Sequence, residues 1–413
     1  MLFVAPETVT VGPEVVGGRI APGAEIHPGC RLHGRRLAIG PGCVLGEEGP
    51  VTLRDCQLGA RVRLRGGFFD RATLLDDVDA GSCAHVRPGT LLEECVSFGH
   101  SVGLKQTVLF PYMTMGSLIN FCDCLMSGGS GVENHSEVGS SYVHFNFTPH
   151  QDKATASLIG DVPRGVMMDQ PPIFLGGQGG LVGPCRIAYG SVLAAGGICR
   201  QDILTPGCLI RAAAPAEGID RPYDPRIMGN VERRIASNLH YLGNLLALDA
   251  WWRVVRLHFA RDAWQRHCHE GALLRLGEMF DERMLRLDQF AEKVALSLTL
   301  AADAPPCRGQ RAFLAAWQQM RETLRARIAA RTTVAPPADG CAILVRASPE
   351  TDGSRGRSPS GSIAACLTGA GGASSASPGS DYLAWVRALP SADKQRLTAW
   401  LQAMVDACVA AGQ

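Results

Sequence analysis

Apolar residues recur at every sixth position in several stretches of this chain, and this period restricts the folds it can adopt. The clearest stretch contains Leu181, Ile187, Leu193 and Cys199. Side chains alternate with a period of two in a strand and recur about every 3.6 residues in a helix, so neither element alone gives a period of six. A triangular coil of short strands gives it, because every sixth side chain points into the interior. The repeat therefore predicts a stacked solenoid.

The same period is found nearer the N-terminus. Two further sets of residues show it: Ile20, Ile26 and Leu32, and Val96, Val102 and Val108. Glycines are frequent between these positions, as expected where the corners of a coil need left-handed backbone. We therefore expect one parallel β-helix over residues 8–212.

The apolar spacing becomes helical after this region. One predicted helix carries its apolar side chains three or four positions apart, at Leu276, Phe280, Met284 and Leu287. This spacing predicts a helical domain over residues 220–335. Residues 336–380 are rich in Ser, Gly and Pro and predict a flexible linker, and residues 381–413 predict short C-terminal helices. The expected fold class is mainly β with α.

Charge and composition exclude several classes of function. The 40 basic residues are offset by 39 acidic ones, which leaves a formal charge of +1. So balanced a chain gives no electrostatic case for nucleic acid or an anionic membrane surface. No signal peptide is visible, and no stretch approaches the roughly 20 apolar residues of a membrane span. We expect a cytoplasmic protein with neither nucleic acid nor membrane as a partner.

Cysteine usage indicates reduced thiols and no metal site. The chain has 15 cysteines without recurring close pairs. The closest pair is Cys122 and Cys124, whose spacing puts both thiols on one face of a strand. No second pair completes a set of four ligands, so buried core cysteines are the favoured interpretation and a metal site the alternative.

Four stretches of the chain share their order and nearly their spacing with a known family. They are AHVRPGTLLEE at 84–94, HSVGLKQTVL at 100–109, HFNFTPHQDKATASLIGD at 144–161 and IFLGGQGGLVGPCRIAYGSVLAAGGICRQDI at 173–203. This region resembles the acetyltransferase domain of bacterial bifunctional N-acetylglucosamine-1-phosphate uridyltransferase/glucosamine-1-phosphate acetyltransferase. The resemblance implies a left-handed β-helix, a homotrimer, acetyl-CoA as acyl donor, and a sugar phosphate or UDP-sugar as ligand.

The resemblance also assigns substrate-binding residues. Arg87 and Lys105 correspond to the family residues that hold the phosphate of the sugar or nucleotide. Arg offers a planar fork and Lys a point charge to phosphate oxygens, and adjacent coils bring them together. The alternative is an exposed basic pair. Asn146 corresponds to the asparagine beside the transferred acetyl group, and Lys153 to a downstream substrate lysine.

On the donor side, the resemblance places Gly177 and Ala195 in the groove for the pantetheine arm of acetyl-CoA. Short side chains suit this role, because a thin extended ligand can then lie against the coil. Arg211 corresponds to an arginine near the CoA phosphates. Its alternative role is that of a solvated arginine at the end of the solenoid.

The departures from the family concern the acceptor end of the site. The family's catalytic histidine falls on Ser117, and its neighbouring substrate tyrosine on Asn120. Glu137 stands where the family has an asparagine. A serine alone cannot accept a proton from an attacking amine near neutral pH, whereas a histidine can. The expected base is therefore missing from its family position.

A replacement base is expected from nearby residues. His144 is the first choice, because it lies two residues before Asn146 and so on the same face of a strand. His135, His150 and Glu137 are the other candidates. The alternatives are that the histidines are surface or structural residues, or that positioning alone suffices for an amine that arrives unprotonated.

An inserted segment, residues 162–172, has no counterpart in the family. Its prolines and the cluster around Met167 predict an ordered flap near the pocket, with Arg164 or Asp169 touching ligand. The alternative is a clamp on a neighbouring subunit. Residues 1–80 do not resemble the family's uridyltransferase domain, so we expect no uridyl transfer by this chain alone.

Three classes of function remain open. The leading one is acetyl transfer from acetyl-CoA to an amino sugar bound through its phosphate or nucleotide. The second is a non-catalytic sugar-nucleotide sensor, favoured by Ser117. The third is a trimeric scaffold whose helical domain recruits a protein partner.

Overall fold

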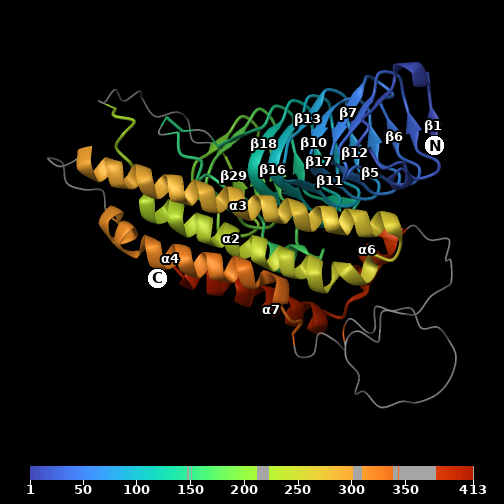
Figure 1. The fold of residues 1–413 in the computed structure, drawn as a ribbon. Coiled ribbons are helices and arrows are strands. Elements are labelled where there is room, and N and C mark those ends of the chain that lie inside the picture. The colour runs from blue at the N-terminus through green and yellow to red at the C-terminus, as the bar shows by residue number, and fades with distance from the viewer. Residues whose placement is uncertain are drawn as a thin grey trace, which may run out of the picture.

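A computed structural model gives the fold (Figure 1). It describes residues 1–146, 148–149, 151–211, 223–300, 309–337, 343 and 378–412. The first half of the chain forms a parallel β-solenoid, and helices run alongside it. The predicted fold class is confirmed, whereas most of the predicted linker lies outside the described residues.

The solenoid has three faces. Its first face is an 11-stranded parallel sheet to which each coil gives one strand. These strands are β1 (Leu2–Phe3), β3 (Glu25–Ile26), β6 (Val44–Leu45), β9 (Arg63–Leu64), β12 (Asp79–Ala80), β15 (Ser97–Phe98), β17 (Thr114–Met115), β21 (Glu137–Val138), β24 (Phe174–Leu175), β27 (Val192–Leu193) and β29 (Leu209–Ile210).

The second and third faces form one 16-stranded sheet, because β16 (Gly103–Leu109) and β18 (Asn120–Met126) bend around the corner between them. The other strands of the second face are β2 (Thr10–Val11), β4 (Arg31–His33), β7 (Val51–Arg54), β10 (Gly67–Asp70), β13 (Ala84–Val86), β22 (Val143–Phe145), β25 (Gly180–Val182) and β28 (Ile198–Cys199). Those of the third face are β5 (Ala38–Ile39), β8 (Gln57–Leu58), β11 (Ala72–Leu74), β14 (Thr90–Leu92), β23 (Ser157–Ile159) and β26 (Arg186–Ile187). A short antiparallel pair, β19 (Gly129–Gly131) and β20 (Asn134–His135), projects from one coil.

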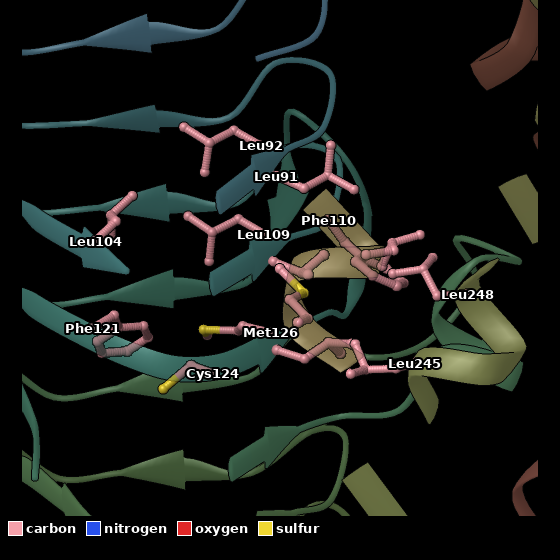
Figure 2. Packing of buried hydrophobic residues seen from close by; sticks show 14 of the residues in the cluster. Leu91, Leu92, Leu104, Leu109, Phe110, Phe121, Cys124, Met126, Leu245 and Leu248 are labelled. Carbon is pink, nitrogen blue, oxygen red and sulfur yellow. The ribbon is translucent and has the colours of Figure 1, made fainter. Parts of the chain in front are cut away.

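The core consists of ladders of side chains that stack from coil to coil. Leu74, Leu92, Leu109, Met126 and Ile159 pair in sequence across β11, β14, β16, β18 and β23. All are inaccessible to solvent, and Figure 2 shows Leu92, Leu109 and Met126 one above the other. Burial of each such side chain stabilises the fold by about 1.5–3 kcal/mol. The period of six therefore reflects this interior.

Two layers of helices lie over the third face. They are α2 (Val231–Val254), α3 (Ala263–Leu300), α4 (Gln310–Ala330), α6 (Pro378–Ala388) and α7 (Ser391–Ala410). Helix α3 packs on β5, β8, β11 and β14, and α2 packs on β23 (Figure 1). Helices α4 and α7 pack on α3 and α2. No helix among the described residues is both long and apolar enough to cross a membrane.

The outward side chains of the third face explain why it is covered. Except for Arg186 on β26, they carry no charge and are buried, as in Gln57, Thr73, Leu91 and Val108. A Cβ on Gly271 of α3 would approach the Gln57 Oε1 atom to 2.4 Å, so glycine permits this close contact. Figure 2 shows Leu245 and Leu248 of α2 beside Phe110 of the solenoid. Burial of these surfaces holds the helices on the coil.

A buried arginine joins the helices to the solenoid. Arg256, in the short 3-10 helix η3 (Arg256–Phe259), donates hydrogen bonds of 2.6 and 2.9 Å to the two carboxylate oxygens of Glu94. Its guanidinium also lies 3.7 Å from the ring centroid of Tyr382 and 4.4 Å from that of Trp252. A paired, stacked charge of this kind fixes the orientation of the two layers.

The insertion at 162–172 lies under the helices of the same chain. Its short helix α1 (Val162–Gly165) packs on α7 and α2. The Val162 amide donates to the Asn244 side chain at 2.8 Å, and the Lys394 ammonium donates to the Met167 carbonyl at 3.0 Å. The segment is therefore an internal docking platform, and the expectation of a flap over the pocket is wrong.

Candidate functional site

Helix α3 follows the corner that joins the second face to the third, which we call the closed corner. Its residues on successive coils include Arg71, Gly89, Gln106 and Asp123. A helix advances 5.4 Å per turn and neighbouring strands lie about 4.8 Å apart, so one helical turn matches roughly one coil. Helix α3 accordingly contacts coil after coil with polar side chains. The Glu278 carboxylate accepts a hydrogen bond of 3.1 Å from the Gly89 amide.

Arg87 and Lys105 lie in one column beside the closed corner. Both precede that corner on adjacent coils, and Lys105 pairs in register with Cys122 on the next coil. The Arg87 guanidinium donates to the Cys122 sulfur at 3.1 Å, while its buried Nε atom has no hydrogen-bond partner among the described residues. The Lys105 ammonium lies 3.8 Å from the Glu282 carboxylate of α3. The structure thus brings the two predicted phosphate ligands together and sets an acidic residue against one of them.

Asn146 and Lys153 lie near the next step of the same corner. The Asn146 amide donates to the Asp123 carboxylate at 3.2 Å. Asp123 also forms a buried ion pair of 2.5 Å with Arg283 of α3, and Arg283 donates to the Lys153 carbonyl at 3.2 Å. Side chains of α3 therefore organise this part of the predicted acceptor site.

An open groove crosses the second face from this column to the opposite corner. Its volume is about 430 Å³, and its lining includes Arg87, Asn120, His85, Ser101 and Leu118. Ser101 and Leu118 adopt positive φ values of 58° and 61°, which turn the chain sharply at the corner. The groove is therefore bounded by a cation at one end and a tight turn at the other.

None of the described α-helices covers the corner between the first and second faces, which we call the open corner. One column of residues runs along it from coil to coil: Ser82, His100, Ser117, Ser140, Gly177 and Ala195. From His100 onward, the residue that follows each member of the column donates its backbone N–H to the carbonyl oxygen of the member one coil earlier. These hydrogen bonds are 2.8 to 3.0 Å long. Ser117 and the two residues predicted for the donor side, Gly177 and Ala195, therefore share one line.

Ser117 forms a hydrogen-bonded pair with His100 on the preceding coil. Its Oγ atom lies 2.8 Å from the His100 Nδ1 atom and accepts the His100 backbone N–H at 3.2 Å. The Ser117 amide in turn donates to the Ser140 hydroxyl at 3.1 Å. His100 is exposed and Ser117 half-buried, so the pair is accessible from the corner.

His144 lies inside the solenoid. Its Nδ1 atom is 2.5 Å from the Cys122 carbonyl oxygen and its Nε2 atom 2.8 Å from the Ser157 hydroxyl, and the side chain is buried. Burial lowers the pKa of His144 to about 4. Both ring nitrogens of His144 therefore have partners within the core, and neither faces the groove. Although His144 and Asn146 are two residues apart on a strand, their side chains do not lie on one accessible surface.

The other predicted bases are dispersed. Glu137 lies on β21 of the first face. His135 lies on β20 with its Nδ1 atom 2.6 Å from the Val132 carbonyl oxygen. His150 falls outside the described residues. None of the described candidates lines the second-face groove.

A second groove, of about 310 Å³, lies at the C-terminal coils. Its lining includes Arg211, Ala194, Cys199 and Asp202. Gly177 and Ala195 do not line it. A Cβ at Gly177 would come within 2.8 Å of the Ser140 carbonyl oxygen, so glycine is also required there for coil stacking. The donor-side predictions therefore divide between the open corner and this groove.

Both cysteines of the closest pair in the sequence lie in the core. Cys122 and Cys124 are buried in β18, and burial raises the pKa of both thiols. No group of three or more possible metal ligands exists among the described residues.

Two features of the site escaped the sequence reasoning. His100 could have been found by its separation of 17 residues from Ser117, which is one coil. Glu282 and Arg283 carry no such signal, because their positions depend on how α3 docks.

Comparison with known proteins finds curated relatives that match part of this chain. No family model matches the chain. The chain is 31% identical over 202 residues to the "Bifunctional protein GlmU" of Pelobacter propionicus, and 31% identical over 191 residues to that of Trichlorobacter lovleyi. The alignments cover 49% and 46% of this chain. The chain spans only 39% and 37% of the length of these relatives. This similarity supports the resemblance over about half of the chain.

Proposed function

We propose that this protein binds a sugar phosphate or UDP-sugar across the second face of the solenoid and transfers an acetyl group to its amino group from acetyl-CoA. The observation that carries the proposal is that the second-face groove runs from the predicted phosphate-binding residues to the column at the open corner. Arg87 lines one end of it, with Lys105 next to Arg87 on the following coil, and Ser117 adjoins the other end, in line with Gly177 and Ala195.

The dimensions of the groove suit this substrate class. Strands advance about 3.3 Å per residue, so Ser101 and Lys105 are separated by about 13 Å along the second face. A phosphate at Arg87 and Lys105 gains charge-assisted hydrogen bonds, and the sugar then extends towards Asn120 and the open corner. Bidentate contact by Arg87 fixes the register of the sugar along the groove.

The donor is assigned to the open corner for a separate reason. Gly177 and Ala195 leave this line of the surface without long side chains for two coils, so an extended pantetheine arm can lie along it. Its thioester then reaches the region of Ser140 and Ser117. Arg211 in the C-terminal groove is the cation for the CoA phosphates.

A homotrimer is part of the proposal. The outward column of the first face ends in three apolar residues on successive coils, Phe174, Val192 and Leu209. They are 38%, 38% and 59% exposed in the single chain. Burial of such a row between subunits would remove it from water.

Calorimetry tests the binding half of the proposal. Acetyl-CoA and UDP-N-acetylglucosamine are titrated separately into the full chain, into Arg87→Ala, and into Arg63→Ala as the control. Arg63 is an exposed arginine of the first face that pairs with Glu47 at 3.4 Å. We expect Arg87→Ala to lose about 10-fold or more in sugar-nucleotide affinity and to keep acetyl-CoA binding, and Arg63→Ala to keep both.

A non-catalytic sensor is the second candidate, favoured by the Glu282 contact with Lys105 and by Ser117 at the family's histidine position. Sugar-nucleotide binding without acetyl-CoA binding would establish it. If neither ligand binds, the result would favour a scaffold.

A further inference from the structure

We propose that His100 is the proton acceptor of the transfer reaction and that it acts through the Ser117 hydroxyl. This inference rests on the proposed function and names the base that the reaction needs. It depends on the pair at the open corner, in which Ser117 Oγ and His100 Nδ1 are 2.8 Å apart.

The hydrogen bonds around Ser117 leave one direction free for a substrate. With Nδ1 unprotonated, the hydroxyl donates its hydrogen to His100, and the His100 backbone N–H donates to the same oxygen at 3.2 Å. The remaining lone pair of Oγ can accept an N–H of an amine in the adjoining groove, which the next residue, Leu118, lines. A serine cannot take this proton alone, whereas a hydrogen-bonded imidazole can receive it.

The step balances without any further reactant. The amine nitrogen bonds to the thioester carbonyl carbon, and the carbon–sulfur bond breaks. The amine proton moves to Ser117 Oγ as the Ser117 proton moves to His100 Nδ1. The imidazolium then returns a proton to the departing thiolate. The products are the N-acetyl sugar and the free thiol, and the histidine is regenerated.

The charges around His100 are already compensated. It borders a groove on the first face that is also lined by Glu48, Arg65 and Asp79. Arg65 pairs with Asp79 at 2.9 Å and with Glu48 at 3.3 Å. These carboxylates are therefore engaged with Arg65, and the ring is directed to Ser117.

One other histidine competes for the role. His85 lines the second-face groove, but its ring packs on Phe68 with centroids 5.2 Å apart. Phe68 lies one coil towards the N-terminus, on the far side of His85 from Ser117. The geometry therefore favours His100, and a substitution of each residue separates the two.

The experiment is steady-state acetyl transfer to glucosamine 1-phosphate by the full chain, followed by thiol release from acetyl-CoA. The variants are His100→Gln, His85→Gln, Ser117→Ala and the double variant His100→Gln with Ser117→His. His33→Gln is the control, on a distant coil. We expect His100→Gln to lower kcat about 100-fold or more and to remove the acidic limb of the pH profile, with both ligand affinities unchanged.

The double variant provides the rescue. It moves the imidazole one coil along the same column, so we expect it to regain at least about 10-fold of the lost kcat. Full activity of His100→Gln with an unaltered pH profile would overturn the inference and leave the proposed function standing. A loss confined to His85→Gln would also overturn it. Binding of both ligands by the wild type without turnover would overturn the proposed transfer itself.

Discussion

The two corners that flank the second face differ in what covers them. At the closed corner, α3 places Glu282 against Lys105 and Arg283 against Asp123. At the open corner no described helix intervenes, and His100 and Ser117 bond only within the solenoid. The closed corner is therefore held by ion pairs with α3, whereas the open corner is accessible. In the function proposed above, the phosphate is bound at the first edge and acetyl transfer takes place at the second.

The buried ion pair at the closed corner gives the largest expected effect. Arg283 and Asp123 side chains are 1% and 4% exposed. We expect Arg283→Ala to lower the free energy of unfolding by about 3–5 kcal/mol, because it leaves a buried carboxylate unpaired. Denaturant unfolding followed by circular dichroism measures this. Arg321→Ala, which removes a partly exposed partner of Asp288, should cost about 1 kcal/mol or less. Equal losses would show that α3 is not anchored there.

A pH-dependent effect is expected where the helices cover the remaining corner. Burial raises the pKa of Asp76 to about 6, from 3.8. The folded state thus binds this proton more tightly, and stability is lost as the pH rises from about 4 through 6. We expect Asp76→Asn to raise the free energy of unfolding by about 2–3 kcal/mol at pH 8 and to change it little at pH 4.

The neighbouring Asp77 is the matched control, because it is exposed and pairs with Arg61. Asp77→Asn should show no comparable gain at pH 8. The same gain at both pH values in Asp76→Asn would contradict the assigned cause.

The contact between Glu282 and Lys105 tests whether the closed corner restrains the ligand. We expect Glu282→Gln to tighten sugar-nucleotide binding by about 3- to 10-fold, because it removes a negative charge beside the phosphate site. Its effect on unfolding should be about 1 kcal/mol, since Lys105 is 30% exposed and Arg286, which pairs with Glu282 at 2.8 Å, is also partly exposed. Calorimetry measures the affinity, with Glu270→Gln on the exposed side of α3 as the control. Weaker binding in Glu282→Gln would instead make the carboxylate part of the ligand site.

The smallest effect is expected at the C-terminal groove. The interaction of Cys199 with the neighbouring Cys185 thiol lowers the pKa of Cys199. We expect Cys185→Ala to slow alkylation of Cys199 by iodoacetamide at pH 7 about 3-fold or more, because less thiolate is present. Peptide mass spectrometry follows the modification, and alkylation of exposed Cys83 serves as an internal reference. An unchanged rate would show that Cys185 does not stabilise the thiolate.

Much of the solenoid could be predicted from local pattern. Leu181, Ile187 and Leu193 are buried as their spacing predicts. The spacing is sufficient because each side of a coil points one such side chain into the interior. The family resemblance points to Arg87 and Lys105, and their separation of 18 residues, one coil, puts them in one column. The burial of His144 could not be predicted in this way. The period of a strand specifies which residues share a face but not whether that face points into the core.

By itself the sequence determined the coil, its core ladders and the helical character of the second half, because these depend on the spacing of apolar residues along the chain. Tertiary structure alone decided which face the helices cover, which corner stays open and which histidine meets Ser117. These contacts join residues such as Glu282 and Lys105, 177 positions apart in the sequence. Their proximity depends on how whole layers dock, and no local periodicity records it.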